Sequence, residues 1–410
     1  MNTTIFALHI SNIKQSPFIT GTRSSFLFKK VKFFNSINPL LYSQQVGKFK
    51  FESSQFTKIL NHAIRIESSS RTLIEQNITQ TLTDIDVESL DIMDCIFMKC
   101  QSNHIGGAFL YNPSSSYSYF SCHNTIFQFC SSESSGAFCV ISKNDYIISC
   151  CFANCYAHVA NQAFSLQCSS QSYYTDSRIE MCTFLNCPDY VIHSHQLFTS
   201  TRLKYLSGIN VSHCNNNLPG IFFKVRDNPS SCSYSYFYNN TGQYPIVLSN
   251  ISKFELSSVM IMMNSIYDGV LLVQATTTIP QINFKNSYIK SNKIYRLNAF
   301  GSSFSSYFQY YYIDQSVYDF LGKFGTVDSE SFRNDIQTMR SSIKTIQGCY
   351  YRERTYQTTL ETIPPAKDNM ILYSISACAI GIAIGATIAV VIYYVKKQKS
   401  VKEWFKQEIE

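Results

Sequence analysis

Short runs of alternating apolar and polar residues recur along much of this chain. Three of them are SLDIMDCIF, DYIISCCF and SRIEMCTF, and each ends in a phenylalanine. Alternation with a period of two residues predicts a β-strand that buries one face, whereas an amphipathic helix repeats every three to four residues. The pattern therefore predicts a series of short strands through the middle of the chain.

A fixed pair of positions marks each run: an apolar residue, followed three positions later by Cys or Asn. The second members of successive pairs lie 30, 25, 32, 27, 26, 24 and 28 residues apart, by subtraction of their numbers. After the pair, a polar stretch often leads to a small-residue turn, as in Gly106-Gly107-Ala108. The pairs are Phe97/Cys100, Phe127/Cys130, Phe152/Cys155, Phe184/Cys187, Val211/Cys214, Phe237/Asn240, Ile261/Asn264 and Ile289/Asn292, with a further early copy at Ile74/Asn77.

Units of this length, with two or three strands each, predict the coils of a solenoid. One coil cannot bury its inner face, but stacked coils about 4.8 Å apart build a continuous core. We therefore expect an all-β solenoid, a right-handed parallel β-helix with an inner ladder of Phe and a turn ladder of Cys or Asn. Asn suits a turn because it tolerates left-handed backbone, and Cys is a small substitute. A β-sandwich is the main competitor, and the recurrence of one motif argues against it.

Two of these motifs resemble those of a known family. Gly106-Gly107-Ala108-Phe109 matches GGA before a bulky apolar residue, Phe237–Asn240 matches F-x-x-N, and four more copies read F-x-x-C. Together they resemble the repeat of polymorphic outer-membrane proteins, which are surface-exposed parallel β-helix proteins. The resemblance covers about Leu90 to Asn292 and implies a role in adhesion or display. The chain departs from the family in having one complete GGA and no barrel after the repeats.

A different pattern lies near the C-terminus. Ile371–Val395 runs for 25 residues without a charge, which is long enough for a helix to cross a bilayer and is unusual for a buried core helix. Lys396 and Lys397 follow at once, so the tail is expected to be cytoplasmic. A face of small residues recurs every fourth position and predicts that two such helices can pack as a homodimer; its members are Ala377, Gly381, Gly385 and Ala389.

The predicted organisation has five parts. Residues 1–70 form an N-terminal cap with degenerate coils, and residues 71–300 form the β-helix repeats. Residues 301–369 form a C-terminal cap and juxtamembrane stalk, 370–395 the transmembrane helix and 396–410 the cytoplasmic tail. The C-terminal cap contains a short amphipathic helix, since Phe332, Ile336, Met339 and Ile343 have helical spacing.

Composition and charge narrow the class of protein. An apolar fraction of 45% and a charged fraction of 15% exclude a disordered chain. The net charge of +7 is spread without a basic block ahead of the tail, so nucleic acid is not an expected partner. The expected partners are the lipid bilayer and an extracellular protein or glycan, with the chain at the plasma membrane or cell surface.

The compartment depends on how the N-terminus is interpreted. MNTTIFALHISNIKQS shows no clear secretory signal, so the signal is cryptic, the start is incomplete, or the protein is tail-anchored with its body in the cytosol. Fourteen of the 15 cysteines precede the apolar segment, which favours the outside. Four sequons point the same way and predict glycosylation at Asn77, Asn210, Asn239 and Asn250.

Several constellations carry chemistry in other proteins. Cys95, Cys100 and His104 suggest zinc, but C-x4-C recurs as Cys150/Cys155 and Cys182/Cys187, which marks it as repeat structure. Neighbouring cysteines on stacked coils can form disulfides or an unbridged buried ladder, and the sequence leaves both open. His193 and His195 lack a third ligand. We expect no metal and no cofactor.

Two classes of function remain. An acidic group, Asp84, Asp86, Glu88, Asp91 and Asp94, is expected on a solvent face; a catalytic role would make the protein a membrane-tethered carbohydrate-active β-helix enzyme. Tyr/Ser clusters at 114–120, 232–240 and 305–314 suit a recognition surface instead. We therefore expect a non-enzymatic surface protein for adhesion or recognition, with the enzyme as the alternative.

Overall fold

The computed structural model describes the following residues of the chain: 2–20, 24–44, 47–67, 88–113, 118–168, 177–187, 198–200, 203–214, 222–224, 230–242, 246–249, 253–266, 271–274, 281–290, 293–294, 305–309 and 312–313. The chain divides into two compact units, Met1–Cys349 and Tyr350–Glu410. Every described residue belongs to the first unit. The predicted transmembrane helix, the tail and the amphipathic helix lie outside the described residues. Within the described residues, no helix is long and apolar enough to cross a membrane.

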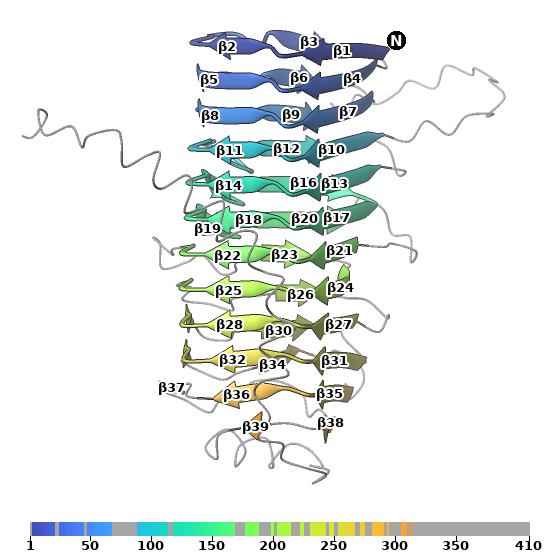
Figure 1. Ribbon diagram of the computed structural model, residues 1–410, viewed down its shortest axis with the longest axis vertical. Coiled ribbons are helices and arrows are strands. Elements are labelled where there is room, and N and C mark those ends of the chain that lie inside the picture. Colours follow the sequence, from blue (N-terminus) through green and yellow to red (C-terminus); the bar gives the residue numbers. More distant parts are fainter. Residues whose placement is uncertain are drawn as a thin grey trace, which may run out of the picture. The chain divides into compact units, whose positions relative to one another are not determined.

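The described residues form an all-β parallel solenoid, which confirms the coarse fold prediction. Three sheets run along the stack, and each strand pairs in parallel with its equivalent one coil away (Figure 1). Each coil therefore contributes one strand to each sheet before the chain steps to the next coil.

Sheet A has twelve strands: β1 (Asn2–Phe6), β4 (Ser24–Lys29), β7 (Gly47–Glu52), β10 (Ser89–Met93), β13 (Tyr119–His123), β17 (Asn144–Ile148), β21 (Ser177–Glu180), β24 (Leu203–Ser207), β27 (Ser230–Ser233), β31 (Lys253–Ser257), β35 (Gln281–Lys285) and β38 (Ser305–Gln309). Sheet B also has twelve: β2 (His9–Ser11), β5 (Lys32–Ser36), β8 (Gln55–Ile59), β11 (Ile96–Met98), β14 (Ile126–Gln128), β18 (Cys151–Ala153), β22 (Thr183–Leu185), β25 (Asn210–Ser212), β28 (Tyr236–Tyr238), β32 (Met260–Met262), β36 (Tyr288–Lys290) and β39 (Tyr312–Ile313).

Sheet C has ten strands: β3 (Phe18–Thr20), β6 (Leu41–Ser43), β9 (Ile64–Glu67), β12 (Phe109–Asn112), β16 (Phe138–Ser142), β20 (Phe164–Cys168), β23 (Phe198–Ser200), β26 (Phe222–Lys224), β30 (Ile246–Ser249) and β34 (Leu271–Gln274). Two short sheets are formed by strands that follow sheet B strands along the chain: β15 (Ser131–Ser134) with β19 (Tyr156–Ala160), and β29 (Thr241–Gly242) with β33 (Ser265–Ile266) and β37 (Lys293–Ile294).

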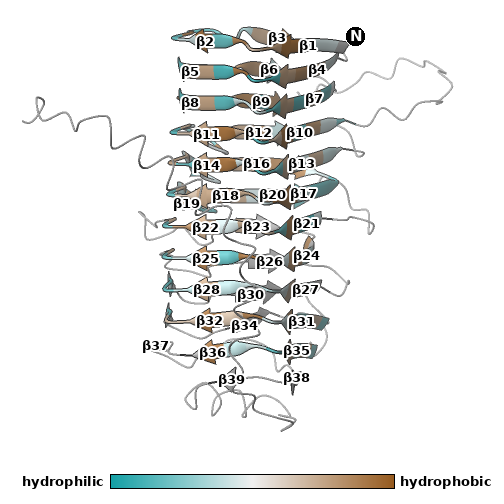
Figure 2. Cartoon of the chain, viewed as in Figure 1, coloured by the Kyte–Doolittle hydropathy of each residue, from teal (hydrophilic) through white to brown (hydrophobic). Residues whose placement is uncertain are grey.

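Phenylalanine columns fill the interior of the stack. In sheet B the rings of Phe97, Phe127 and Phe152 stack nearly parallel, with centroids 5.1 and 5.0 Å apart. In sheet C, Phe109 and Phe138 stack at 4.6 Å. Each stacked pair adds about 0.5–1.5 kcal/mol to the burial of its rings. Figure 2 shows the result as brown, apolar segments in β11 and β14, with polar residues toward the corners.

Left-handed residues turn the chain at both ends of sheet B. The residue before each corner has a positive φ near 50–65° in almost every coil, for example Asp94 (53°) and Lys99 (55°). Its backbone N–H donates to the neighbouring coil, as from Lys99 to the Gln128 carbonyl oxygen. The left-handed position is thus the residue before the Cys or Asn of the motif, so the expected left-handed role of the Cys/Asn position was wrong.

The N-terminal region belongs to the same stack. Residues 1–70 were expected to form a cap with degenerate coils, and the strands of residues 2–67 join the three sheets in register. They lack the Cys/Asn marker because Ser36 and Ile59 occupy that corner. In addition, β8 pairs directly with β11. The predicted early copy at Ile74/Asn77 lies outside the described residues.

Candidate recognition face

The outer face of sheet A carries a column of aromatic and charged side chains. Strand alternation buries Phe120, Ile147 and Ile179 in the core and turns the residues beside them outward. On three successive coils the outward residues are Tyr146, Arg178 and Tyr205, which the parallel register places directly in line. We call these three residues the tyrosine–arginine column.

Contacts between neighbouring coils order this column. The Arg178 guanidinium lies 5.9 Å from the centroid of the Tyr146 ring and 5.0 Å from that of Tyr205. Tyr119, one coil before Tyr146, packs on it with ring centroids 5.3 Å apart. A cation held between two aromatic rings is stabilised by about 0.5–2 kcal/mol per contact and loses little further freedom on binding.

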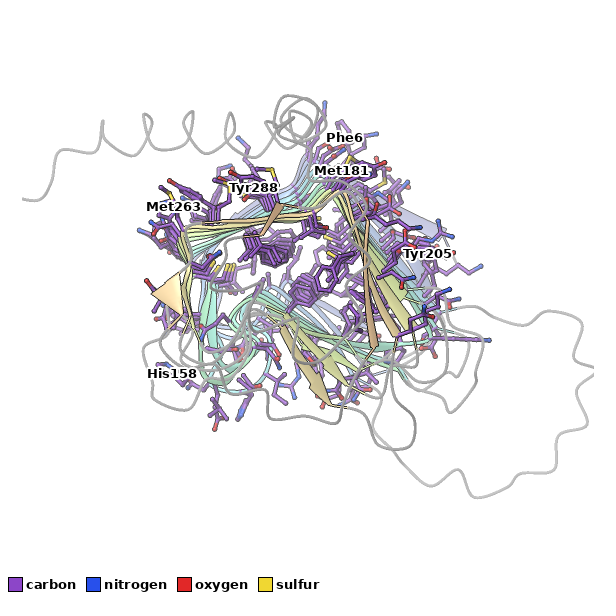
Figure 3. All side chains as sticks on the ribbon, turned by 90° about the horizontal axis from the view of Figure 1, so that it is seen from below. Phe6, His158, Met181, Tyr205, Met263 and Tyr288 are labelled. Carbon is purple, nitrogen blue, oxygen red and sulfur yellow. The ribbon has the colours of Figure 1, made fainter. Side chains whose placement is uncertain are left out.

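The column remains accessible to a ligand. Tyr205 is 39% exposed and projects outward from the outline of the coils in Figure 3. Tyr146, Arg178 and Tyr119 are half-buried. Partial burial, with a smaller effect of Asp91, raises the pKa of Tyr119 above its ordinary value, so its hydroxyl stays a hydrogen-bond donor. The face therefore offers hydroxyl and guanidinium donors together with aromatic surface.

A second group of tyrosines lies on sheet B. Tyr236 and Tyr238 stack at 5.5 Å, His213 packs edge-on against Tyr238 at 5.8 Å, and Tyr234 is 49% exposed at a left-handed corner. The predicted Tyr/Ser cluster at 232–240 is thus split, since Phe237 points into the core. The side chains of the cluster at 305–314 lie outside the described residues.

The acidic group does not form one solvent face. Glu88 is 2% exposed, which contradicts its expected position, because it begins the strand region at an inward-facing site. Asp91 is half-buried and accepts a hydrogen bond from the Ser121 hydroxyl. Asp84 and Asp86 lie outside the described residues, as do His193 and His195.

A buried polar cluster inside the stack was missed by the sequence analysis. Asp145 follows Leu90 and Phe120 in one inward column, and the Ser142 and Ser177 hydroxyls donate to its carboxyl group. Burial raises the pKa of Asp145 from 3.8 to about 7. The buried Tyr111 hydroxyl lies nearby without a hydrogen-bond partner among the described residues. The position of Asp145 could have been found, since it shares the inward parity of Ile147.

His62 is the other buried titratable group. Its Nε2 lies 2.7 Å from the Ile105 carbonyl oxygen and 3.2 Å from the Ser102 hydroxyl. Burial lowers its pKa from 6.5 to about 4, so the imidazole is neutral at physiological pH. Both partners belong to residues outside the named strands, so His62 stabilises the connection between strands through these hydrogen bonds.

The Cys and Asn positions of the motif make equivalent hydrogen bonds along the stack. The Cys130 and Cys155 thiols lie 3.5 Å from the carbonyl oxygens of Phe97 and Phe127. In later coils an amide replaces the thiol: the Asn240 and Asn264 Nδ2 groups donate to Val211 and Phe237 carbonyl oxygens at 2.9 and 3.0 Å. Cys and Asn interchange because each supplies a small inward donor for the same carbonyl ladder. Cys100, Cys187 and Cys214 belong to the same ladder, beside the buried Phe184.

The C-x4-C spacing reflects the width of sheet B. Cys95 and Cys100 stand at opposite ends of β11, each directly after a left-handed residue, and both are 0% exposed. His104 lies beyond the second corner. Among the described residues, no group of three His, Cys, Asp or Glu side chains could hold a metal ion. The twelve cysteines whose side chains the structure describes are buried and form no disulfide bond in it.

Two of the predicted glycosylation residues are described. Asn239 is exposed at a left-handed corner. Asn210 is only 3% exposed and its Oδ1 accepts a hydrogen bond of 2.6 Å from the Ser212 hydroxyl, so this amide is hidden in the folded chain. Asn77 and Asn250 lie outside the described residues, as do Ala377, Gly381, Gly385 and Ala389.

Comparison of this chain with models of protein families, with curated proteins and with solved structures gave no match.

Proposed function

We propose that the protein is a non-enzymatic, single-pass surface protein whose β-helix binds a ligand through the tyrosine–arginine column. The observation that carries this proposal is the ordered stack of Tyr146, Arg178 and Tyr205 on the outer face of sheet A. Pre-ordered aromatic and arginine side chains are typical of binding hot spots, since little entropy is lost on association.

Binding to cell monolayers and to a glycan array tests this proposal. The full chain in detergent or in vesicles should bind, and Tyr146→Ala and Tyr205→Ala should each weaken binding about tenfold or more. Tyr42→Ala is the matched control, because Tyr42 packs against Arg65 at 5.8 Å on sheet C. Equal binding by all three variants would exclude the column as the binding site.

The outward orientation of the β-helix is part of the same proposal. It is supported by the lysines after the apolar segment and by the exposed sequon at Asn239. Endoglycosidase treatment of the protein from a eukaryotic host should shift its mass, and Asn239→Gln should remove one glycan. Asn210→Gln should remove none, because Asn210 is buried. A chain without any glycan would indicate a cytosolic body instead.

A further inference from the structure

Two buried cysteines from adjacent coils bring their sulfur atoms into contact. Cys122 lies on β13 and Cys150 stands at the corner after β17, and their Sγ atoms are 3.6 Å apart. Both side chains are 0% exposed. The Cys150 thiol also lies 3.3 Å from the carbonyl oxygen of Cys122, so its side chain is already turned toward the neighbouring coil.

We propose that Cys122 and Cys150 form a disulfide bond that links two successive coils when the chain folds in an oxidising compartment. This inference rests on the proposed outward orientation of the β-helix. A disulfide needs an S–S distance of about 2.05 Å, so its formation requires the two side chains to rotate and bring the sulfur atoms about 1.5 Å closer.

The reaction requires an external disulfide such as glutathione disulfide. A bond forms between the two Sγ atoms, two protons and two electrons leave the thiols, and the external disulfide is cleaved to two thiols. Burial raises the pKa of Cys122 well above its ordinary value. Both thiols are fully buried and out of reach of an external disulfide once the core has closed, so the bond must form while the coils assemble.

Other pairings are the competing outcome. Cys182 follows Cys150 in the same corner ladder, and its thiol lies 3.7 Å from the Ile147 carbonyl oxygen. Cys139 lies on sheet C, where burial raises its pKa to about 12. Side-chain contacts also join Cys150 to Cys182, and Cys130 to Cys100 and Cys155, so a pairing set by chance during folding would spread along these ladders. We favour Cys122 with Cys150 because the Cys150 thiol is turned toward both the sulfur and the carbonyl oxygen of Cys122.

Differential alkylation of the full chain, refolded in detergent in a glutathione redox buffer, tests the pairing. Free thiols are blocked with iodoacetamide in denaturant, the protein is reduced, and newly released thiols are labelled with N-ethylmaleimide and assigned by peptide fragmentation. We expect the second label on Cys122 and Cys150 in most molecules. Label on Cys150 together with Cys182, or the first label on both Cys122 and Cys150, would overturn the proposal.

Variants separate pairing from folding and from location. Cys122→Ser should leave Cys150 as a free thiol, and Cys150→Ser should leave Cys122 free, while Cys139→Ser should keep the bond. Circular dichroism confirms that each variant retains its strands. If the pair forms on refolding but is reduced in protein taken from its own cells, the orientation of the β-helix is wrong and the pairing is not.

Discussion

At the scale of single residues, the corners of the stack hold residues other than glycine in a left-handed backbone conformation that they rarely adopt. Met181 has a φ of 53°, and the equivalent residue one coil later is Gly208, with a φ of 65°. A left-handed conformation costs a residue with a Cβ about 1–2 kcal/mol. The corners are tolerated because each such N–H is paired along the stack, as from Met181 to the Ser207 carbonyl oxygen at 2.8 Å.

Met181→Gly should therefore stabilise the protein. We expect a gain of about 0.5–1 kcal/mol in the free energy of unfolding, because the relief of strain exceeds the entropy that glycine adds to the unfolded chain. Met181 is 42% exposed, so little packing is lost. Denaturant unfolding measures the difference. The reverse change, Gly208→Met, should destabilise, and a gain there would contradict the argument.

Asp145 is a residue whose ionisation should set a pH dependence of stability. Its pKa is about 7 in the folded chain and near 3.8 when unfolded, so the folded state holds its proton longer. The contribution of Asp145 to the free energy of unfolding is then fully present below pH 3.8 and is lost as the pH rises toward 7. Over this window the wild type should lose on the order of 4 kcal/mol relative to Asp145→Asn.

The neutral His62 acts in the opposite direction. Its pKa falls from 6.5 to about 4 on folding, so its contribution is present above pH 6.5 and is lost as the pH falls toward 4. Unfolding curves of the wild type and Asp145→Asn between pH 4 and 8 isolate the carboxyl group, since His62 is common to both. Parallel curves would show that Asp145 is ionised in the folded chain.

At the scale of elements, the small-residue turn brings backbones of adjacent coils together. A Cβ on Gly107 would overlap the carbonyl oxygen of Gly136, and a Cβ on Gly136 would overlap that of Gln162. The GGA motif is therefore required for close approach of the backbones, and it positions Phe109 over Phe138 in the sheet C column.

Gly107→Ala should destabilise the stack by about 2–4 kcal/mol, because backbone rather than a side chain must move. Thermal unfolding should show a lower midpoint, with a matched Ala substitution at the exposed Lys99 as the control. A midpoint equal to that of the control would mean that the two coils can separate without cost.

The elements also show what could be predicted from the sequence. Phe127 and Cys130 predicted a strand and a corner, because the same three-residue spacing between an apolar residue and Cys or Asn recurs in most coils. The N-terminal coils were expected only as degenerate coils, since Ser36 and Ile59 fill the same corner without repeating the marker. Tyr146, Arg178 and Tyr205 are separated by 32 and 27 residues, as are Cys155, Cys187 and Cys214. The marker spacing could therefore have aligned them, whereas the contacts between their side chains required the structure.

At the scale of the whole molecule, a solenoid is a sum of coils that contact only their neighbours. Removal of one whole coil should therefore preserve the fold. Deleting residues 126–150 joins Thr125 to Cys151, and Cys151 pairs with Ile126 in the intact stack. The shortened chain then places Phe152 directly on Phe97 and continues both ladders.

We expect this deletion variant to keep its β-sheet circular dichroism and a cooperative unfolding transition at a somewhat lower midpoint. It should bind ligand less well, because Tyr146 is lost while Arg178 and Tyr205 remain. Deleting only residues 126–137 is the control: it brings Phe138 from sheet C into the place of Ile126, breaks every ladder and should prevent folding. Equal damage from the two deletions would mean that these coils do not act as independent units.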